Sequence, residues 1–479
     1  MRQRCVLLAL VFLMVARAAN AEGDDASKSD APPKVDEDPG FFASLTAQHQ
    51  ATLSLLVIQG LKNTSHGFKP SRELRLTDKA KIISGRNSVV WNLRLEVSRS
   101  LLTKGPSSDE PIADQHISLP NGSVLDKNYA LIVQEAYVQH LREHWMLQVG
   151  SQMFAWGSAD SINPMSVFNP QDLRSGFLGD KETKIAPIPA VRLALLSDGQ
   201  TLNFIYAPWR RASLLPGPTQ NWYLAPDNLS FNVQLTPKKS VEDQGSYAIK
   251  YDRSIAEGDL SFLYYEGADY DIETVPKELL VINNQPLTVN LVQVVPDKTS
   301  YGASYSQTFG KWVLKAETLY TSNKLAIPDV DRNRIQDVRF PLELQKTSYL
   351  QATLGFNYFA PITQFFGLPL GDTVLTAEYY KAHYNKKGVI QPSLSDLIIT
   401  NLRTTAMEDR LELGLTYGLS PTDQGRTWSG KLSFNGDTFR HNLIYAGFDG
   451  RQPAANKTGS IFYYWRNNDL VSYEIAYPL

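Results

Sequence analysis

The chain has 479 residues, with 47 Lys and Arg against 49 Asp and Glu, and a formal net charge of −2 at pH 7. This balance offers no basic stripe of the kind that binds nucleic acid. The only cysteine, Cys5, excludes an internal disulfide and a cysteine-ligated metal site.

Residues 1–21 predict an export signal. Arg2 and Arg4 precede an apolar run that begins at Cys5, and small residues lead up to Ala21. A charged start, an apolar centre and a small-residue cleavage site are typical of a secretory signal peptide. The apolar run is too short to span a bilayer as a helix. We therefore expect cleavage after Ala21.

The next two segments carry weaker signals. Residues 22–40 are rich in Asp, Glu, Ser, Pro and Lys, and we expect a disordered acidic tail in the periplasm. Residues 41–87 fit either short strands or a short amphipathic helix. We therefore predict an N-terminal segment that forms an extra hairpin or a partial plug.

From residue 88 onward, apolar and polar residues alternate. In residues 88–98, 410–417 and 427–435 nearly every second side chain is apolar, and those between are polar or charged. One face would suit lipid and the other an aqueous lumen, as in a transmembrane β-barrel. A soluble secreted β-protein stays open as an alternative, because alternation is common in half-buried strands.

The strand pattern predicts an all-β fold, a single antiparallel transmembrane barrel of about 16 strands over residues 88–479. An extra N-terminal hairpin would give 18. The predicted strands begin near residues 88, 129, 144, 189, 200, 245, 258, 299, 311, 346, 373, 410, 427, 438, 458 and 469. Short links alternate with long ones, as in bacterial barrels with short periplasmic turns and long outer loops. The exceptions are a long apolar link at 358–372 and very short outer links at 436–437 and 467–468.

The most specific local pattern lies in residues 132–196. It contains Val149-Gly150-Ser151-Gln152, Trp156-Gly157, Asp160, Asn163-Pro164 and Asn169-Pro170, followed by a proline-containing return segment. This block resembles a group of poorly characterised Gram-negative outer-membrane barrels that carry Gly-Arg-Gln, Trp-Gly, Asp and Asn-Pro. The resemblance implies a porin-like protein or a transporter of hydrophobic compounds. Ser151 stands where that group usually has Arg, so the role of that Arg does not carry over.

The block opens a long loop, residues 154–188, which we predict folds back and narrows the barrel. Pro164 and Pro170 favour extended conformations at the residues before them and stiffen the loop. Its constriction candidates are Asp160, Asn163, Asp172, Arg174, Asp180, Lys181 and Glu182. In the alternative interpretation, these charges cap turns and pair with one another at the outer surface.

Charged residues on the polar faces of the strands are the candidates for lining the lumen: Arg94, Glu96, Lys315, Glu317, Arg410, Glu412 and Lys431. Mixed charge at a narrow point would set the selectivity of a pore.

The final strand alternates from Val471 to Leu479 and then the sequence ends. It resembles the C-terminal insertion signal of Gram-negative outer-membrane proteins, with Leu479 in place of the usual terminal aromatic residue. The resemblance implies recognition by the barrel-assembly machinery.

Together these patterns predict a porin-like channel for small solutes in the outer membrane of a Gram-negative bacterium. Hydrolase, phosphate-loop and zinc-protease motifs are missing from the sequence, so we expect no enzyme, no cofactor and no metal. The expected surroundings are outer-membrane lipid and lipopolysaccharide, with an unidentified small-molecule cargo and no nucleic acid. A homotrimer is one assembly left open. Two alternatives are a conduit for hydrophobic or lipid-like compounds and an adhesive surface anchor with a closed lumen.

Overall fold

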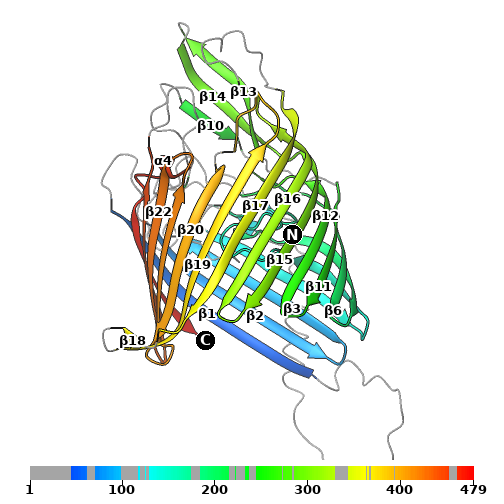
Figure 1. Ribbon diagram of the computed structural model, residues 1–479, viewed down its shortest axis with the longest axis vertical. Coiled ribbons are helices and arrows are strands. Elements are labelled where there is room, and N and C mark those ends of the chain that lie inside the picture. The colour runs from blue at the N-terminus through cyan, green and yellow to red at the C-terminus, as the bar shows by residue number, and fades with distance from the viewer. Residues whose placement is uncertain are drawn as a thin grey trace, which may run out of the picture.

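The computed structural model describes residues 45–61, 71–98, 117–118, 124–125, 129–173, 184–214, 222, 232–236, 244–271, 273–282, 285–329, 343–362, 364–365, 368–392, 394–451 and 461–479. These residues form a closed antiparallel barrel of 18 strands (Figure 1). The last strand pairs with the first, with Ser472 opposite Ile58 and Pro478 opposite Thr52, and this pairing closes the ring.

The barrel strands follow one another around the wall in chain order. They are β1 (Leu45–Gly60), β2 (Ser71–Ser84), β3 (Asn87–Ser98), β6 (Tyr129–Leu141), β7 (Trp145–Gln152), β8 (Ile188–Ser197), β9 (Gln200–Ala207), β11 (Ser246–Ile255), β12 (Gly258–Ala268), β15 (Asp297–Phe309), β16 (Trp312–Ala326), β17 (Gln345–Ala360), β19 (Leu368–Tyr384), β20 (Asp396–Ala406), β21 (Leu411–Ser420), β22 (Gly425–Asn435), β23 (Arg440–Asp449) and β24 (Leu470–Pro478).

The two ends of the barrel differ in the length of their connections. At the short-turn end, tight turns such as 85–86, 198–199, 256–257 and 310–311 join neighbouring strands. At the long-loop end, the connections include 153–187, 208–245 and 269–296. Strand β1 starts and β24 finishes at the short-turn end, as the alternation of links predicts.

The remaining elements are not part of the barrel wall. Strands β10 (Asn232–Thr236), β14 (Gln285–Val294) and β13 (Glu273–Ile282) form a small sheet above the long-loop end (Figure 1). Short strands β4 (Ile117–Ser118) and β5 (Val124–Leu125) extend from the edge of β6, and β18 (Gln364–Phe365) forms a tight hairpin with β19. Helix α4 (Ile461–Tyr464) lies between β23 and β24. Among the described residues, no helix is both long and apolar enough to cross a membrane.

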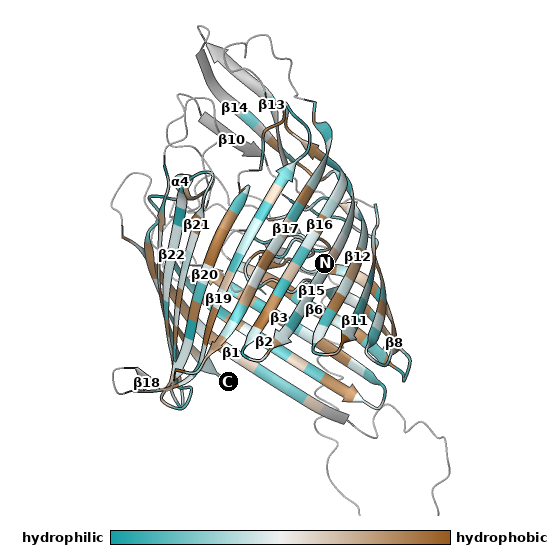
Figure 2. Cartoon of the chain, in the orientation of Figure 1, coloured by the Kyte–Doolittle hydropathy of each residue, from teal (hydrophilic) through white to brown (hydrophobic). Residues whose placement is uncertain are grey.

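Apolar side chains cover the outside of the barrel. Leu413, Leu432, Leu443 and Tyr473 stand opposite one another on adjacent strands and are all exposed. Figure 2 shows apolar and polar residues following one another along the strands. Because side chains alternate between the two faces of a strand, the intervening polar residues face the lumen. An apolar outside around a polar inside is the arrangement of a barrel in lipid.

Three expectations from the sequence need correction. The barrel has 18 strands instead of about 16, and β1 and β2 form the extra N-terminal hairpin that was one of the two alternatives for residues 41–87. Strand β20 lies between the strands predicted near residues 373 and 410, where the pattern predicts a long link over residues 385–409. The strand predicted near residue 458 is replaced by helix α4 from Ile461, while residues 452–460 lie outside the described part of the chain.

The predicted links change accordingly. The link at 436–437 belongs to the short-turn end, and the last connection at the long-loop end runs from Gly450 to Asp469. Most of the link predicted at 358–372 is strand, since β17 continues to Ala360 and β19 begins at Leu368. One missed strand and one false strand offset each other, so the direction of the final strand was still predicted correctly.

Candidate functional site

The segment between β7 and β8 is described over residues 153–173 and 184–187, and these residues turn into the barrel; we call them the inserted loop. Phe154, Met165 and Phe168 are buried. Phe168 packs edge-on against Tyr265 of β12, with 5.8 Å between ring centroids. Tyr265 is completely buried and its position on β12 faces the lumen. The described part of the loop therefore lies against the inner wall.

A buried carboxylate of the wall holds the tip of the inserted loop. Glu317 on β16 is 3% exposed and accepts hydrogen bonds from three backbone amides. Ser158 N and Ala159 N lie 3.0 and 3.3 Å from Oε2, and Met165 N lies 2.6 Å from Oε1. Gly157 completes this contact, because its φ is +99° and a Cβ there would lie 2.3 Å from the Glu317 carboxylate.

A second carboxylate and two further contacts extend the anchor across neighbouring strands. Glu378 on β19 accepts from Asp160 N at 2.6 Å and Ser161 N at 2.8 Å. Thr353 of β17 donates to the Ile162 carbonyl at 3.1 Å. Lys315 of β16 pairs with the Asp160 side chain at 2.6 Å. The loop is thus attached through backbone amides and charge, which fixes its position more tightly than apolar contact alone.

Asn169 closes the neck of the inserted loop. Its side-chain amide donates to the carbonyls of Gln152 at 3.1 Å and Ala186 at 3.0 Å, and its Oδ1 accepts from Phe154 N at 2.7 Å. A further backbone bond joins Ala186 N to the Pro170 carbonyl at 2.8 Å. The Asn-Pro pair of the sequence block therefore ties the two ends of the loop together.

A second group of aromatic residues fills the lumen near the long-loop end; we call it the aromatic plug. It contains Trp222, Phe448 of β23, Phe462 of α4 and Trp465, all buried. Trp222 lies edge-on to Phe448 and Trp465, with ring centroids 5.7 and 5.3 Å apart. These residues belong to a larger buried cluster that includes Tyr349 of β17 and Tyr380 of β19, and Ile162 of the inserted loop packs against this cluster. The inserted loop and the aromatic plug are therefore connected through one continuous buried cluster.

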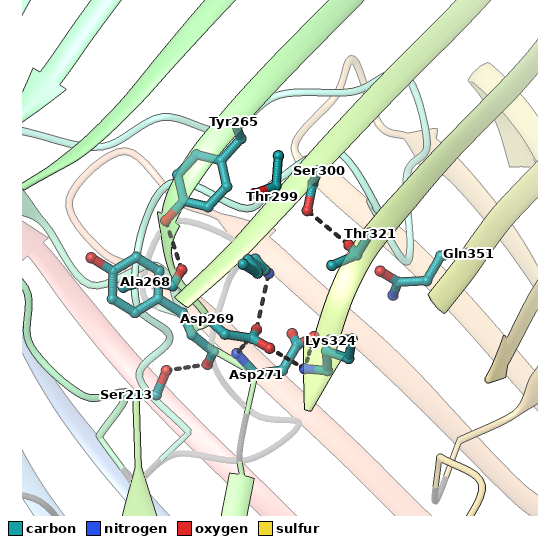
Figure 3. Close-up of polar contacts among 12 residues, drawn as sticks. Ser213, Tyr265, Ala268, Asp269, Asp271, Thr299, Ser300, Thr321, Lys324 and Gln351 are labelled. Carbon is teal, nitrogen blue, oxygen red and sulfur yellow. Dashed lines mark hydrogen bonds and ion pairs between the residues drawn. The ribbon is translucent and has the colours of Figure 1, made fainter. Parts of the chain in front are cut away.

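A buried ion network fixes the connection that leaves β12 (Figure 3). Asp269 has a fully buried side chain and pairs with Lys298 at 3.0 Å and Lys324 at 2.6 Å. Lys324 also contacts Asp271 at 3.0 Å. Burial alone would raise the pKa of the Asp271 carboxyl, but Lys324 and then Lys298 outweigh it and lower that pKa. Two acids and two bases give this network no net charge, so it is best explained as a structural support.

The predicted constriction residues fall into two groups. Asp160 lies at the anchored tip of the loop. Asn163 lies in the same part of the loop, and its carbonyl accepts a hydrogen bond from Ser166 N. Asp172 is buried at the neck, where its backbone amide donates to the Lys184 carbonyl. The other four candidates, Arg174, Asp180, Lys181 and Glu182, lie outside the described residues.

Most predicted lumen residues occupy inward positions. Arg94 and Glu96 form a 2.7 Å ion pair on β3, and Glu412 and Lys431 pair at 3.4 Å on β21 and β22. Lys315 and Glu317 hold the inserted loop, as described above. Arg410 differs, because it precedes β21 in a turn and pairs at 3.3 Å with Asp437 at the short-turn rim. The alternation placed it on the strand, but the strand begins one residue later.

The space left in the lumen lies beside the N-terminal strands. A cavity of ≈670 Å³ separates β1, β2, β3 and β6 from the inserted loop. The inserted loop contributes Met153, Ala155 and Ile185 to its lining, and the barrel wall contributes Gln48, His49, Gln50, Lys79, Ala80, Lys81, Val90, Trp91, Asn92 and Glu135.

The polar residues of β1 and β2 that line this cavity are missing from the lumen candidates that the sequence predicts. The signal was present in β2, where Glu73, Arg75, Lys79 and Lys81 recur at even spacing. Such spacing places all four on the lumen face of one strand. Among the described residues, no group of three or more His, Cys, Asp or Glu could hold a metal ion.

No family model and no curated protein matches the sequence. Solved structures that match include a BenF-like porin from Pseudomonas fluorescens, with 9% identity and a TM-score of 0.46 over 90% of this chain and 98% of that one. OccAB3 of Acinetobacter baumannii matches with 10% identity and a TM-score of 0.45, over 90% and 99% of the two chains. Salmonella typhi OmpF, in a complex with daunomycin, matches with 9% identity and a TM-score of 0.42, over 90% and 97%. At these values the likeness establishes neither family nor function for this chain.

Proposed function

We propose that this chain is a porin-like channel of a Gram-negative outer membrane. The observation that carries the proposal is a closed 18-strand barrel, apolar outside, whose polar lumen is narrowed by a loop attached to the inner wall. Barrels of 16 to 18 strands are wide enough for an aqueous passage. A loop held inside such a barrel reduces this width to the scale of a small solute.

The path runs along the N-terminal strands. The inserted loop and the aromatic plug occupy the β9–β24 side of the long-loop end, and the ≈670 Å³ cavity lies between the loop and β1–β3. Solutes would pass between this wall and the loop. In this account Asp160 and Lys315 set the charge at the loop tip, and Arg94 and Glu96 set it higher on the wall.

The alternative of a conduit for hydrophobic compounds finds less support. Apolar residues face the lumen mainly where the inserted loop and the aromatic plug pack on the wall. Toward the short-turn end, inward positions carry hydrogen-bonded polar side chains such as Gln148, Arg192 and Asn203. A hydrophobic cargo would have to strip water from these groups, which is costly.

One observation favours a second role as a surface-binding barrel. The β10–β14–β13 sheet stands above the long-loop end (Figure 1), where it could present a surface to a partner. This role and a channel are compatible, because the sheet lies outside the barrel wall.

Single-channel recording tests the proposal. The detergent-folded protein would be inserted into a planar bilayer at two salt concentrations, with a salt gradient to obtain a reversal potential. We expect discrete steps that scale with salt, and a reversal potential that shifts when Lys315 is replaced by Gln. Silence from protein shown to be folded would overturn the channel.

A further inference from the structure

We propose that the hairpin between β17 and β19 inserts sideways into the phospholipid leaflet at the short-turn end of the barrel. Residues 359–370 form this segment, which we call the apolar hairpin. The short-turn end of a bacterial barrel faces the periplasm, so the leaflet concerned is the inner leaflet of the outer membrane. This role goes beyond the proposed channel and shares with it only the position of the barrel in a membrane.

The apolar hairpin differs in composition from the other connections at its end of the barrel. Residues 359–371 contain no Asp, Glu, Lys or Arg. Each of the other connections between neighbouring strands at this end has at least one charged residue, among them Arg86, Arg142, Asp198, Glu257, Lys311, Asp409 and Asp437. The other connections are therefore suited to water, and the apolar hairpin is the exception.

Apolar side chains of the hairpin and of the neighbouring turn are exposed. Phe359 is 47% exposed and Ile362 is 46% exposed. Leu370, at the end of the hairpin, stands opposite Ala406 of β20. Met407 follows Ala406 directly and is 48% exposed. Exposed apolar side chains that gather in one region mark a contact with a membrane or with another protein.

The direction of the hairpin favours the membrane. Figure 1 shows β18 at the lower left, to the side of the strand ends and not below them. Tyr358 precedes the hairpin, and its ring centroid lies 4.4 Å from that of Trp312. Such aromatic residues gather where a bilayer meets water. Farther up β17, Leu354 is 60% exposed on the lipid-facing side. A sideways apolar segment at this level continues the lipid-facing surface into the plane of the interface.

The charged residues at the base of the hairpin fit the same position. The Lys311 carbonyl accepts from Phe359 N at 2.9 Å, and the side chain of Lys311 is exposed. Asp372 and Arg410 are exposed on the side of β19 and β20. An apolar segment bounded by charged residues can place its side chains among acyl chains and leave the charges among head groups and water. Because apolar burial is non-directional, a phospholipid satisfies this segment without specific polar partners.

Fluorescence quenching in vesicles tests this position. Cys5, the only cysteine of the sequence, would be replaced by Ser, and one bimane label would be attached through Ile362→Cys. The protein would be folded into phosphatidylcholine vesicles that carry bromine on the upper part of their acyl chains. We expect bromine to quench this label at least about half as strongly as a label attached through Leu415→Cys on the outer face of β21. Iodide in water should quench it at least about twofold less than a label attached through Asp437→Cys.

A matched pair of variants separates the hairpin from the label. Phe359→Asp with Met407→Asp should lower bromine quenching at position 362 to the level of the Asp437 site, because charged side chains stay in water. Phe439→Asp changes an aromatic residue of similar exposure, 42%, in the turn before β23, and should leave the quenching at position 362 unchanged. A heat-dependent gel shift would show that each variant is folded.

Quenching at position 362 by iodide alone would place the hairpin in water, and protection from both quenchers would place it against protein. Either result would overturn the insertion, as would unchanged bromine quenching in the double Asp variant. The label at position 415 separates this proposal from the channel. If bromine does not quench that label, the barrel is not in the membrane and the proposed function fails as well. If bromine quenches it but not the label at position 362, only the hairpin insertion is lost.

Discussion

Glu317 shows how a single buried side chain can position a whole loop. Its carboxylate accepts three backbone amides of the inserted loop. Hydrogen bonds to a charged group contribute about 1.5–3 kcal/mol each. Nothing in the strand pattern distinguished Glu317 from a solvated lumen residue, because its partners lie more than 150 positions away in the sequence.

Replacing Glu317 with Gln should loosen the inserted loop, because the new NH₂ group would face amide donors. We expect a higher and noisier single-channel conductance and faster protease cleavage near Ser158. Glu257→Gln, an exposed turn residue at the short-turn end, is the control and should behave like the native protein. Native noise and native cleavage in the Glu317 variant would show that this carboxylate does not hold the loop.

Asn169 makes a comparable prediction at the loop neck. Asn169→Leu keeps the size of the side chain but orphans one amide and two carbonyls, at about 1–3 kcal/mol for each buried group. The thermal midpoint of the folded barrel should fall, and the loop should become accessible to proteases. Asn385→Leu in an exposed loop, which loses one hydrogen bond, should have a much smaller effect. Equal midpoints in the two variants would argue against a tied neck.

The Asp271 network predicts a dependence on acid. Since the folded state lowers the pKa of Asp271, its contribution to stability is present above the unfolded pKa of about 3.9 and is lost as the pH falls below it. Asp271→Asn should therefore lower the thermal midpoint at pH 7 and flatten its fall below about pH 4. The control, Asp437→Asn at the exposed rim, should keep the native profile. A profile in Asp271→Asn as steep as the native one would contradict the ion network.

At the scale of elements, the sequence predicts strands well wherever one face meets lipid and the other meets water. It fails where the lumen is filled. Leu397 and Ile399 of β20 face inward onto the aromatic plug while Ile398 faces out, so three apolar residues run together and the alternation disappears. Phe462 and Trp465 are apolar residues near α4, where the sequence predicts a strand from residue 458. They belong to the plug and not to a strand of the wall. Ile58 of β1 also faces inward onto the buried cluster that contains the plug, so β1 carries apolar residues on both faces at its end and the alternation is lost there.

The candidate site was predictable in part. The inserted loop was expected from its length and its Asn-Pro pairs, whereas its anchors and the lysine wall depend on contacts between distant strands. Register across β1, β2 and β3 brings Gln50, Lys79 and Asn92 together. A single sequence shows the face of each strand but not which residues stand opposite each other.

A matched pair of substitutions tests which face meets lipid. Leu415 is 59% exposed on the outer face of β21, and its neighbour Thr416 points into the lumen. Leu415→Arg should reduce assembly in membranes, since an arginine at the bilayer centre costs about 2–4 kcal/mol on the lipid face. Thr416→Arg should assemble normally and shift the reversal potential toward anions. If both variants assemble equally well, the outer face of β21 does not meet the bilayer core.

At the scale of the whole molecule, the inserted loop and the aromatic plug both pack against the inside of the barrel. The closed ring leaves no strand edge exposed, so a wall of exposed apolar residues is stable in lipid. The interior is divided, with a filled side under the aromatic plug and an open side along β1–β3. In the proposed channel, the loop and not the number of strands would therefore set the width of the passage.

Conductance with and without the loop tip is the most direct measure of this claim. Residues 156–167 can be replaced by a short Gly-Ser linker, because Asn169 bonds to Phe154 N and to the Gln152 carbonyl and so holds the two ends of this segment close together. The account predicts small, salt-proportional steps for the native protein and steps at least about twofold larger for the deletion, since channel width limits ion flow. Equal conductance of the two proteins, both shown to be folded, would contradict it.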